Sequence, residues 1–286
     1  MEVQLAPTSR PGEAEELARA ATGQGVDLVL VCGGDGTINE VINGLAPSRI
    51  PLGILPGGTA NILGKELRLP HDPVRAAAEL PRWSPRRIGL GQATWQPRVP
   101  SQARGTSSDQ QVPGRRYFVS VAGVGFDAHI VYKLSSELKM SWGVAGYVLE
   151  AFRQVVRYPF PAFTCQMDGR ECRATFAVVH RTRLYAGWLH LAPSADLFEP
   201  RFAVCYFKSG RWPRYLVYAA VVLMRQHLRL SDVELVEARK VSCAAVEPGM
   251  TIHFELDGEL VGTLPATLEI VPDALTLLVP PSQAGN

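Results

Sequence analysis

The sequence predicts an α/β domain with a Rossmann-like parallel sheet, followed by a mainly antiparallel, β-sandwich-like domain. Three observations support this fold class. Helical patterns alternate with short apolar runs over the first part of the chain, which is typical of βαβ units. Glycine-rich loops follow two of these apolar runs. Later segments with strand character dominate, and two helical patterns interrupt them. We therefore place one domain over residues 1–84 and a second over residues 85–286.

The composition is that of a globular protein. Among 286 residues, 47% are hydrophobic and 20% are charged, which argues against a disordered or fibrous chain. The formal net charge of +2 gives no strong positive field, so we expect no nucleic-acid partner. A membrane-spanning helix needs an apolar run of about 18 residues. The nearest candidate, Tyr215–Met224, is shorter and is interpreted as a core helix.

The N-terminus and the cysteines indicate a cytoplasmic protein with reduced thiols. The first residues lack the apolar region of a signal peptide and carry acidic side chains such as Glu13, Glu15 and Glu16. The chain has five cysteines, an odd number, and none of them has CxxC spacing. We expect these thiols to be mostly buried, without a metal or redox role.

The first elements follow one another in βαβ order. The range Pro11–Thr22 has apolar residues on one helical face, with Thr8 among its candidate caps. The nearly uninterrupted apolar run Val26–Cys32 fits a parallel strand that is covered on both faces. A second helix follows, and Thr37 and Glu40 have the spacing of a capping box at its start.

Two glycine-rich loops follow the strands of this domain. The first, Gly33–Thr37, reads GGDGT, and the second, Gly57–Thr59, connects the strand Leu52–Leu55 to a helix that Pro70 ends. Glycine lets the backbone approach a phosphate closely, and a helix N-terminus offers unpaired N–H groups. Two such loops at neighbouring strand ends could hold one triphosphate. Both could instead be tight βα turns, but the phosphate interpretation is favoured because the pattern occurs twice.

Three side chains in these loops are candidates for ligand contacts. Thr37 and Thr59 could each cap a helix, contact phosphate, or do both. Asp35 would repel a phosphate unless a cation lay between them. The carboxylate of Asp35 therefore indicates a Mg²⁺ ion that is held together with the phosphates of ATP.

The second domain consists mainly of predicted strands. Residues 97–116 are rich in Pro, Ser, Gln, Gly and Arg, and we expect a mobile insertion there. Helical patterns occur at about Ser141–Val156 and Leu216–Leu228. The dipeptides Asp168-Gly169 and Asp257-Gly258 are typical of hairpin turns. The predicted strands are Tyr117–Val121, Phe163–Met167, Ala174–Val179, Phe202–Phe207, Thr251–Leu256 and Leu275–Val279.

Five segments of the chain resemble one enzyme family. Val31–Val41 contains GGDGT, and Leu52–Asn61 contains the second glycine loop. Phe118–Ala128 (FVSVAGVGFDA), Leu189–Ala195 (LHLAPSA) and Asp257–Glu259 (DGE) follow in the expected order and spacing. Together these segments resemble the bacterial diacylglycerol kinase-like lipid kinases, whose catalytic domain is shared by sphingosine and ceramide kinases. GGDGT alone is less specific, because NAD kinases and phosphofructokinases carry similar loops.

The resemblance implies a lipid kinase that uses ATP and Mg²⁺ and has its active site between two domains. The proton acceptor of the family matches Glu259, with Asp257 beside it, and Asp35 is the third catalytic candidate. A carboxylate can take the proton of a lipid hydroxyl while the loops position ATP. The residues implied to contact the nucleotide are Thr8, Gly33, Gly34, Asp35, Gly36, Thr37, Ile38, Asn39, Gly58, Thr59 and Asn61.

Three segments depart from the pattern of the family. The family opens with a strand that ends in an Asn-Pro turn, and this chain begins after it, so we expect an exposed sheet edge there. An Asp that binds a structural Mg²⁺ is replaced by Pro200, which has no side-chain oxygen, so this metal site is not expected. The range His180–Trp188 replaces a Gly-Asn turn, and His180 is interpreted as a packed or surface residue.

A lipid kinase has to reach its substrate at a membrane surface as a peripheral protein. Basic residues and tryptophans could form a membrane-facing patch, although an ordinary solvated face fits the pattern equally well. Two other functions stay open: a soluble-substrate kinase of the NAD-kinase type, and a degenerate member that binds lipid or nucleotide without transfer. The sequence determines neither the lipid nor the oligomeric state, and a homodimer is compatible with it. The residues of the predicted patch are Arg181, Arg183, Trp188, Lys208, Arg211, Trp212 and Arg214.

Overall fold

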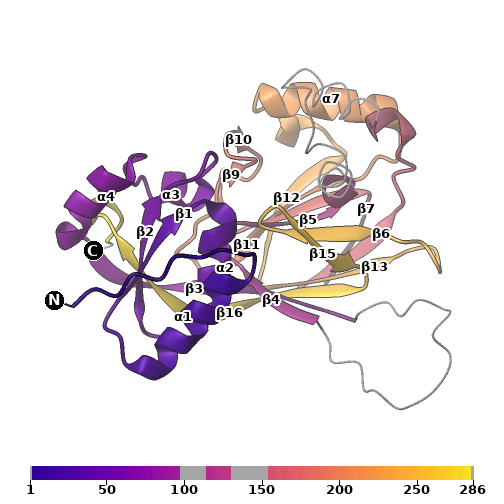
Figure 1. Cartoon of the computed structure of the whole chain (residues 1–286). Coiled ribbons are helices and arrows are strands. Elements are labelled where there is room, and N and C mark those ends of the chain that lie inside the picture. The colour runs from indigo at the N-terminus through magenta and orange to yellow at the C-terminus, as the bar shows by residue number, and fades with distance from the viewer. Residues whose placement is uncertain (1, 97–113, 130–153, 285–286) are drawn as a thin grey trace, which may run out of the picture.

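The protein consists of an α/β part and a β-sandwich that share one sheet (Figure 1). The computed structural model describes residues 2–96, 114–129 and 154–284. The predicted fold class is confirmed: an α/β domain precedes a mainly antiparallel, sandwich-like domain. Of the insertion predicted over residues 97–116, the part up to 113 lies outside the described residues, and 114–116 belong to a strand. Most of the helix predicted at 141–156 also lies outside them.

The helices of the α/β part pack on parallel strands. Val31 lies opposite Ile54 in the parallel pair of the first two strands, and the second helix packs on this pair. A Cβ on Gly44 would lie 2.3 Å from the carbonyl oxygen of Glu15, so glycine allows the first two helices to approach closely. The elements are α1 (Glu13–Gln24), β1 (Val29–Gly33), α2 (Asp35–Leu45), β2 (Pro51–Pro56), α3 (Ile62–Glu66), α4 (Pro73–Glu79) and the 3-10 helix η1 (Leu80–Arg82).

The capping box predicted at the start of α2 is wrong. α2 begins two residues before Thr37, with Gly34 as its N-cap and without a side-chain cap. Glu40 therefore lies in the second turn and reaches the neighbouring helix instead. Its carboxylate accepts the N–H groups of Gly12 and Ala14 at 2.8 and 3.2 Å, so that it caps α1.

The helix predicted after the second glycine loop ends well before Pro70. α3 stops because Arg68 adopts a left-handed conformation, with φ of 59°. The N–H of Leu69 then donates to the carbonyl oxygen of Gly64 at 2.8 Å, which is a typical helix termination. α4 follows as a separate helix that the sequence did not predict.

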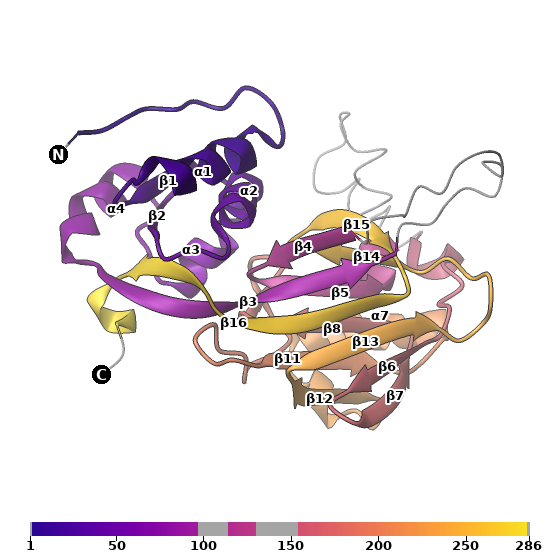
Figure 2. The same ribbon diagram turned by 90° about the horizontal axis from the view of Figure 1, so that it is seen from below.

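Two long strands join the α/β part to the sandwich (Figure 2). β3 (Ser84–Trp95) and β16 (Ala266–Val279) are antiparallel to each other, and the end of β16 also pairs in parallel with β2. The register of β16 shifts between Val271 and Leu275, where the strand passes from the sandwich to the α/β part. The C-terminal strand thus completes the N-terminal sheet in the order β1-β2-β16.

Glycines hide β3 in the sequence. Gly89 and Gly91 interrupt its apolar alternation, and they weaken the strand signal. In the structure a Cβ on Gly91 would lie 2.3 Å from the ring of Phe118, so this ring packs directly on the backbone of β3. The same glycine that weakens the prediction therefore has a packing role.

The sandwich packs the far part of the shared sheet against a six-stranded antiparallel sheet. Phe118 and Phe202 come from opposite sheets and stack with ring centroids 5.6 Å apart, fully buried. The strands predicted at Phe163–Met167 and Phe202–Phe207 are confirmed to the residue. The strands are β4 (Gly114–Phe118), β5 (Val121–Gly125), β6 (Phe163–Met167), β7 (Arg170–Ala174), β8 (Phe176–His180), β11 (Phe202–Phe207), β12 (Val233–Ala238), β13 (Lys240–Ala245), β14 (His253–Leu256) and β15 (Glu259–Thr263).

One helix lies at the periphery of the sandwich. α7 (Trp212–Leu223) packs beside the short hairpin of β9 (Leu184–Tyr185) and β10 (Leu189–His190), at the top of Figure 1. Over the described ranges, no helix is both long and apolar enough to cross a bilayer. The 3-10 helices η2 (His227–Arg229) and η3 (Pro281–Gln283) complete the elements named for these residues.

Candidate active site

The two glycine loops lie side by side at the carboxyl ends of β1 and β2. The N–H of Gly57 donates to the carbonyl oxygen of Gly33 at 2.9 Å, so the loops are hydrogen-bonded to each other. A Cβ on Gly58 would lie 2.5 Å from the Cα of Gly34, which leaves no room for a larger residue. Backbone packing therefore requires these glycines, and it joins the N-termini of α2 and α3 into one unit.

Neither loop threonine caps a helix. The N-cap of α2 is Gly34 and that of α3 is Asn61, so both predicted capping roles are wrong. Within the described part of the chain, the hydroxyl groups of Thr37 and Thr59 make no hydrogen bond, and Thr59 is exposed. Both hydroxyls remain available to a ligand beside the N-termini of the two helices.

Asp35 links the two loops through a backbone contact. As the first residue of α2, it accepts the N–H of Ile62 through one carboxylate oxygen at 2.7 Å, and it thereby caps α3. Its other oxygen makes no hydrogen bond to a described residue. The described residues contain no cluster of three or more His, Cys, Asp or Glu side chains that could hold a metal. A single carboxylate fits a Mg²⁺ ion that takes most of its ligands from phosphate and water.

Asn39 carries a buried donor without a partner. Its side chain is 2% exposed, and its Nδ2 has no hydrogen-bond partner among the described residues. An unsatisfied buried group of this kind costs about 1–3 kcal/mol. Asn39 lines a small cleft together with Asp35, Ser120 and Asp257, which lie in different elements. An acceptor atom of a ligand or water in this cleft would satisfy the donor.

Three other residues with implied nucleotide contacts are placed differently. Ile38 is a buried core residue, and its N–H donates to the carbonyl of Gly34 within α2 at 3.0 Å. Asn61 adopts φ of 47° and bonds the N–H and C=O of Gly58 at 2.9 and 2.7 Å, so its amide fixes the turn of the second loop. Thr8 is exposed in the segment before α1, and no hydrogen bond joins it to the glycine loops.

Asp257 fixes the point where the chain changes sheets. Its carboxylate accepts the N–H groups of Val119, Ser120 and Val121 at 2.9, 2.8 and 2.9 Å. These backbone groups cannot then pair with a neighbouring strand. The single strand predicted at 117–121 is therefore wrong, because β4 ends at Phe118 and β5 begins at Val121 in the other sheet.

The backbone around Asp257 forms a tight hairpin between β14 and β15. Asp257 and Gly258 have φ of 50° and 86°, the left-handed pair of a type I′ turn. Burial raises the pKa of Asp257 to about 6, against the effect of the three N–H donors, which favour the charged form. Asp168 and Gly169 form a similar turn, with φ of 45° and 89°, between β6 and β7. Local turn geometry thus does not distinguish the two hairpins.

Glu259 follows this turn and faces the first glycine loop. A Cβ on Gly36 would lie 3.5 Å from the Oε1 of Glu259, so the structure brings GGDGT and the late DGE motif together. The other oxygen of Glu259 accepts from the Nη2 of Arg116 at 2.5 Å. Arg116 lies in the segment that was predicted as an insertion. Because Arg116 and Glu259 are far apart in the sequence, no local pattern predicts their contact.

A buried carboxyl pair supports the same hairpin. Glu255 is 1% exposed and accepts the N–H of Gly258 at 2.5 Å. Burial raises the pKa of Glu255 well above its usual range, and the neighbouring charge of Asp127 raises it further. Asp127 also accepts the hydroxyl of Tyr185. Burial therefore favours the protonated form of Glu255 beside Asp127, a pairing that the sequence analysis missed.

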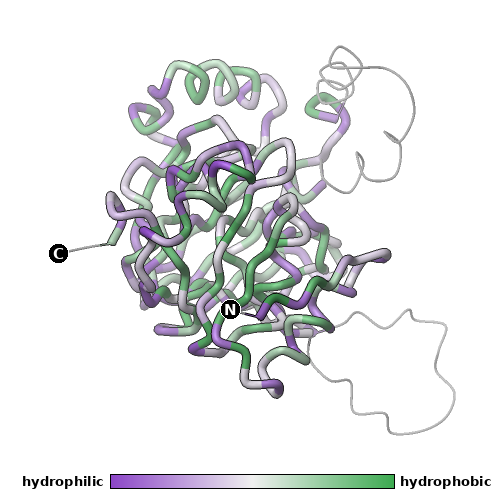
Figure 3. The backbone as a smooth tube through the Cα atoms, turned by 60° about the vertical axis from the view of Figure 1, so that its left-hand side comes forward, coloured by the Kyte–Doolittle hydropathy of each residue, from purple (hydrophilic) through white to green (hydrophobic). Residues whose placement is uncertain are grey.

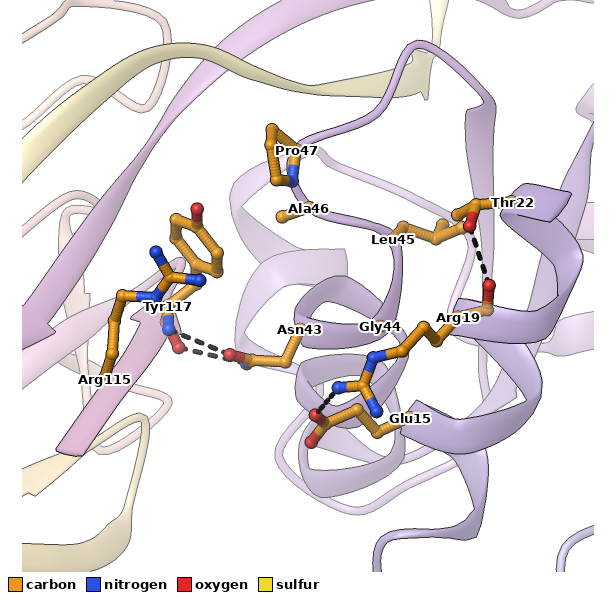
Figure 4. A pocket seen from close by; sticks show the side chains of 10 residues that line it. All are labelled: Glu15, Arg19, Thr22, Asn43, Gly44, Leu45, Ala46, Pro47, Arg115 and Tyr117. Atoms are coloured by element: carbon orange, nitrogen blue, oxygen red, sulfur yellow. Dashed lines mark hydrogen bonds and ion pairs between the residues drawn. The ribbon is translucent and has the colours of Figure 1, made fainter. Parts of the chain in front are cut away.

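A separate cleft of about 320 Å³ lies at the opposite end of α2 (Figure 4). There Asn43 accepts the N–H of Tyr117 at 2.8 Å and donates to its carbonyl oxygen at 3.1 Å, which ties α2 to β4. This cleft is remote from the glycine loops and does not belong to the candidate active site. It is lined by Glu15, Arg19, Thr22, Asn43, Gly44, Leu45, Ala46, Pro47, Arg115 and Tyr117.

The segment after β10 does not fit a structural Mg²⁺ ion. Pro200 offers no side-chain oxygen, and the guanidinium of Arg181 lies among the backbone carbonyls of this segment. Arg181 is fully buried, so its place in the predicted membrane-facing patch is wrong. His180 is also fully buried, and burial lowers its pKa to about 4, as expected for a packed residue.

Comparisons with known proteins cover almost the whole chain. The family model described as "Diacylglycerol kinase catalytic domain" matches residues 1–93, and "YegS C-terminal NAD kinase beta sandwich-like domain" matches residues 120–279. A diacylglycerol kinase of Bacillus subtilis is 28% identical over 90% of this chain and 79% of its own length. A diacylglycerol kinase of Mycobacterium tuberculosis is 29% identical over 94% and 82%.

Solved structures show the same fold. A crystal structure from Bacillus anthracis superposes with a TM-score of 0.70 at 22% identity and covers 96% of this chain and 85% of that chain. A diacylglycerol kinase from the same organism superposes with a TM-score of 0.65 at 19% identity, over 96% and 84%.

Gly58→Ala is expected to lower the free energy of unfolding by about 1–3 kcal/mol, the usual cost of overpacking. The new methyl group would meet the backbone of Gly34, which cannot turn away as a flexible side chain could. Gly23→Ala is the matched control, because a Cβ at Gly23 meets no atom within 4 Å. Urea unfolding of both variants checks this, and equal stability would contradict the packing of the two loops.

Asp257→Asn is expected to change how stability depends on pH. The raised pKa means that folded Asp257 keeps its proton between about pH 4 and 6, where the unfolded chain has lost it. This group therefore destabilises the folded state progressively as pH rises through that window. The unfolding free energy of wild type minus that of Asp257→Asn should fall from pH 4 to 6 and stay constant above pH 6. A constant difference throughout would contradict the assigned pKa.

Proposed function

Because this chain belongs to the diacylglycerol kinase catalytic-domain family of lipid kinases, we propose that it transfers the γ-phosphate of ATP to the hydroxyl group of a lipid such as diacylglycerol or a sphingoid base. The observation that carries the proposal is the position of Glu259 beside Gly36. A carboxylate there lies next to a loop suited to phosphates, as phosphoryl transfer to a hydroxyl requires.

The joined glycine loops are proposed to hold the triphosphate. Two helices begin at these loops, and their first N–H groups and positive dipole ends favour an anion. The hydroxyls of Thr37 and Thr59 and the unpaired Nδ2 of Asn39 would add side-chain donors on the same side. Asp35 would hold Mg²⁺ through the carboxylate oxygen that α3 does not use. When bound, Mg²⁺ supplies positive charge that offsets the charge of the phosphates.

Glu259 is proposed to accept the proton of the lipid hydroxyl as its oxygen bonds to the γ-phosphorus, while the bond from this phosphorus to the bridging oxygen breaks and ADP leaves. Arg116 orients its carboxylate through the 2.5 Å contact and places a positive charge beside the reacting groups. Asp257 keeps the hairpin in place by holding three N–H groups at the start of β5. In this division of roles, Glu259 contacts the substrate and Asp257 positions Glu259.

The lipid is proposed to arrive from a membrane surface beside α7. Tyr215 and Tyr218 bury one face of this helix, whereas Trp212, Leu216 and Leu223 are exposed on the other. Hydrophobic residues line α7, at the top of the molecule in Figure 3. A helix that is apolar on both faces needs a second apolar partner.

The charges around α7 favour an anionic bilayer as that partner. The sequence has no acidic residue between Glu199 and Asp232, although it has six Arg or Lys residues in that interval. Three of the predicted patch residues are already paired: Arg183 with Glu66, Lys208 with Glu234, and Arg214 with Asp232. The membrane-facing surface that we propose therefore combines the exposed face of α7 with Trp188, Arg211, Arg225 and Arg229.

Glu259→Gln is expected to lower kcat for lipid phosphorylation by about 10²–10⁴-fold, because the amide cannot take a proton. Asp35→Asn should also abolish most activity while its amide oxygen still caps α3. Transfer of labelled phosphate from ATP to lipid alcohols in mixed micelles with Mg²⁺ measures both variants. Asp168→Asn, in the remote hairpin of similar geometry, is the matched control and should retain full activity.

Two outcomes would overturn this proposal. Phosphorylation of NAD but not of lipid would identify a soluble-substrate kinase. ATP binding by the folded wild type without transfer to any lipid alcohol would identify a non-catalytic binder.

The triple variant Trp212→Ser, Leu216→Ser, Leu223→Ser is expected to bind anionic vesicles about ten-fold more weakly, because it removes the apolar surface that would enter the bilayer. Cosedimentation with phosphatidylglycerol vesicles, with phosphatidylcholine vesicles for comparison, measures this. Leu17→Ser, which changes an exposed leucine on α1, is the control. Unchanged vesicle binding, or a wild-type dimer that the triple variant loses, would assign the face of α7 another occupant.

A further inference from the structure

Arg181 places a positive charge in the interior of the protein. Its side chain has no exposed surface, and it is among the largest fully buried side chains. No described carboxylate forms a salt bridge with it; its partners are backbone carbonyl groups. A buried charge is stable when hydrogen bonds replace its contacts with water.

Four carbonyl oxygens converge on this guanidinium. Nη1 donates to the carbonyls of Glu199 and Arg201 at 2.5 and 2.8 Å. Nη2 donates to the carbonyl of Gly89 at 3.0 Å and to that of Leu197. Three of these carbonyls belong to residues 197–201, and the fourth belongs to β3.

A ring of carbonyl dipoles around one cation is the arrangement by which proteins bind metal ions with oxygen ligands. Here the cation is part of the chain. Burial lowers the pKa of Arg181 to about 10, and the charges of Asp196 and Glu199 oppose this shift, so the side chain stays protonated at neutral pH. Pro200, in the same loop, also has no side-chain oxygen that could bind a metal ion.

We propose that the guanidinium of Arg181 is a built-in cation that replaces a structural metal ion in the loop 196–201. The folded protein therefore needs no divalent cation for its stability. This inference concerns the fold of the chain and does not depend on the proposed kinase activity.

The cation sits at the junction of the two parts of the protein. Leu197, in the loop that Arg181 holds, packs into the core of the α/β part, and the ring of Phe198 lies 3.5 Å from the guanidinium carbon of Arg86. The N–H of Arg181 itself donates to the carbonyl of Ser120 at 2.8 Å. The N–H of Ser120 is in turn one of the donors to Asp257. Arg181 therefore connects the loop, the core of the α/β part and the hairpin that carries Glu259.

The first experiment compares wild-type protein with and without EDTA. We expect an unchanged melting temperature and no bound divalent metal by elemental analysis of protein purified without added metal. A melting temperature that falls in EDTA and returns with Mg²⁺ or Ca²⁺, or a stoichiometric metal, would overturn the proposal.

The second experiment removes the internal cation. Arg181→Ala removes the guanidinium that donates to four carbonyls, and those of Gly89 and Leu197 are buried, so we expect a lower melting temperature that Mg²⁺, Ca²⁺ or a few millimolar guanidinium raises in this variant but not in wild type. Arg201→Ala, which removes an exposed arginine from the same loop, is the control and should show neither effect. An Arg181→Ala protein as stable as the control would contradict the proposal.

If Arg181→Ala does not fold, Arg181→Lys is the alternative variant, because lysine retains one internal positive charge. We expect it to fold in EDTA with intermediate stability. A requirement of this variant for a divalent cation would contradict the proposal.

Discussion

The hydrogen bonds between Asp257 and three consecutive N–H groups are the contact on which the rest of the site depends. They occur where the chain leaves one sheet at β4 and enters the other at β5, so the N–H groups have no strand to pair with. A carboxylate with two oxygens can satisfy all three groups at once. Because Asp257 also begins the hairpin, the same contact sets the position of Glu259 opposite α2.

Buried charge is concentrated at this junction, and backbone groups solvate most of it. Asp257 accepts three N–H groups, and Arg181 donates to four carbonyls. Burying an ion costs less free energy when fixed dipoles replace its contacts with water. When these dipoles are backbone groups, their hydrogen bonds to the ion also hold that part of the backbone in place. Asp257 therefore stabilises the backbone at residues 119–121, and Arg181 stabilises the loop 196–201.

The glycine loops illustrate how one residue type serves two requirements. The contact between the two loops leaves no space for a Cβ on Gly58 and little space for one on Gly34. The same absence of side chains exposes the N-termini of α2 and α3 to a ligand. A GGDGT pattern therefore cannot by itself separate a tight turn from a phosphate site. The structure adds a contact that the pattern does not show: Glu259 lies across from Gly36, which is more than two hundred positions earlier in the chain.

The sequence by itself determined the fold class, the glycine loops and the family, because these depend on residues close together in the chain. Hydrophobic alternation located strands such as Phe163–Met167, and the motifs identified Glu259 and Asp35 as candidates. Only the tertiary structure decided what Glu40 caps and how β16 completes the first sheet. It also decided that Arg181 is internal. These contacts join residues that are far apart in sequence, and a side chain's nearest polar partner is set by packing, which no local pattern encodes.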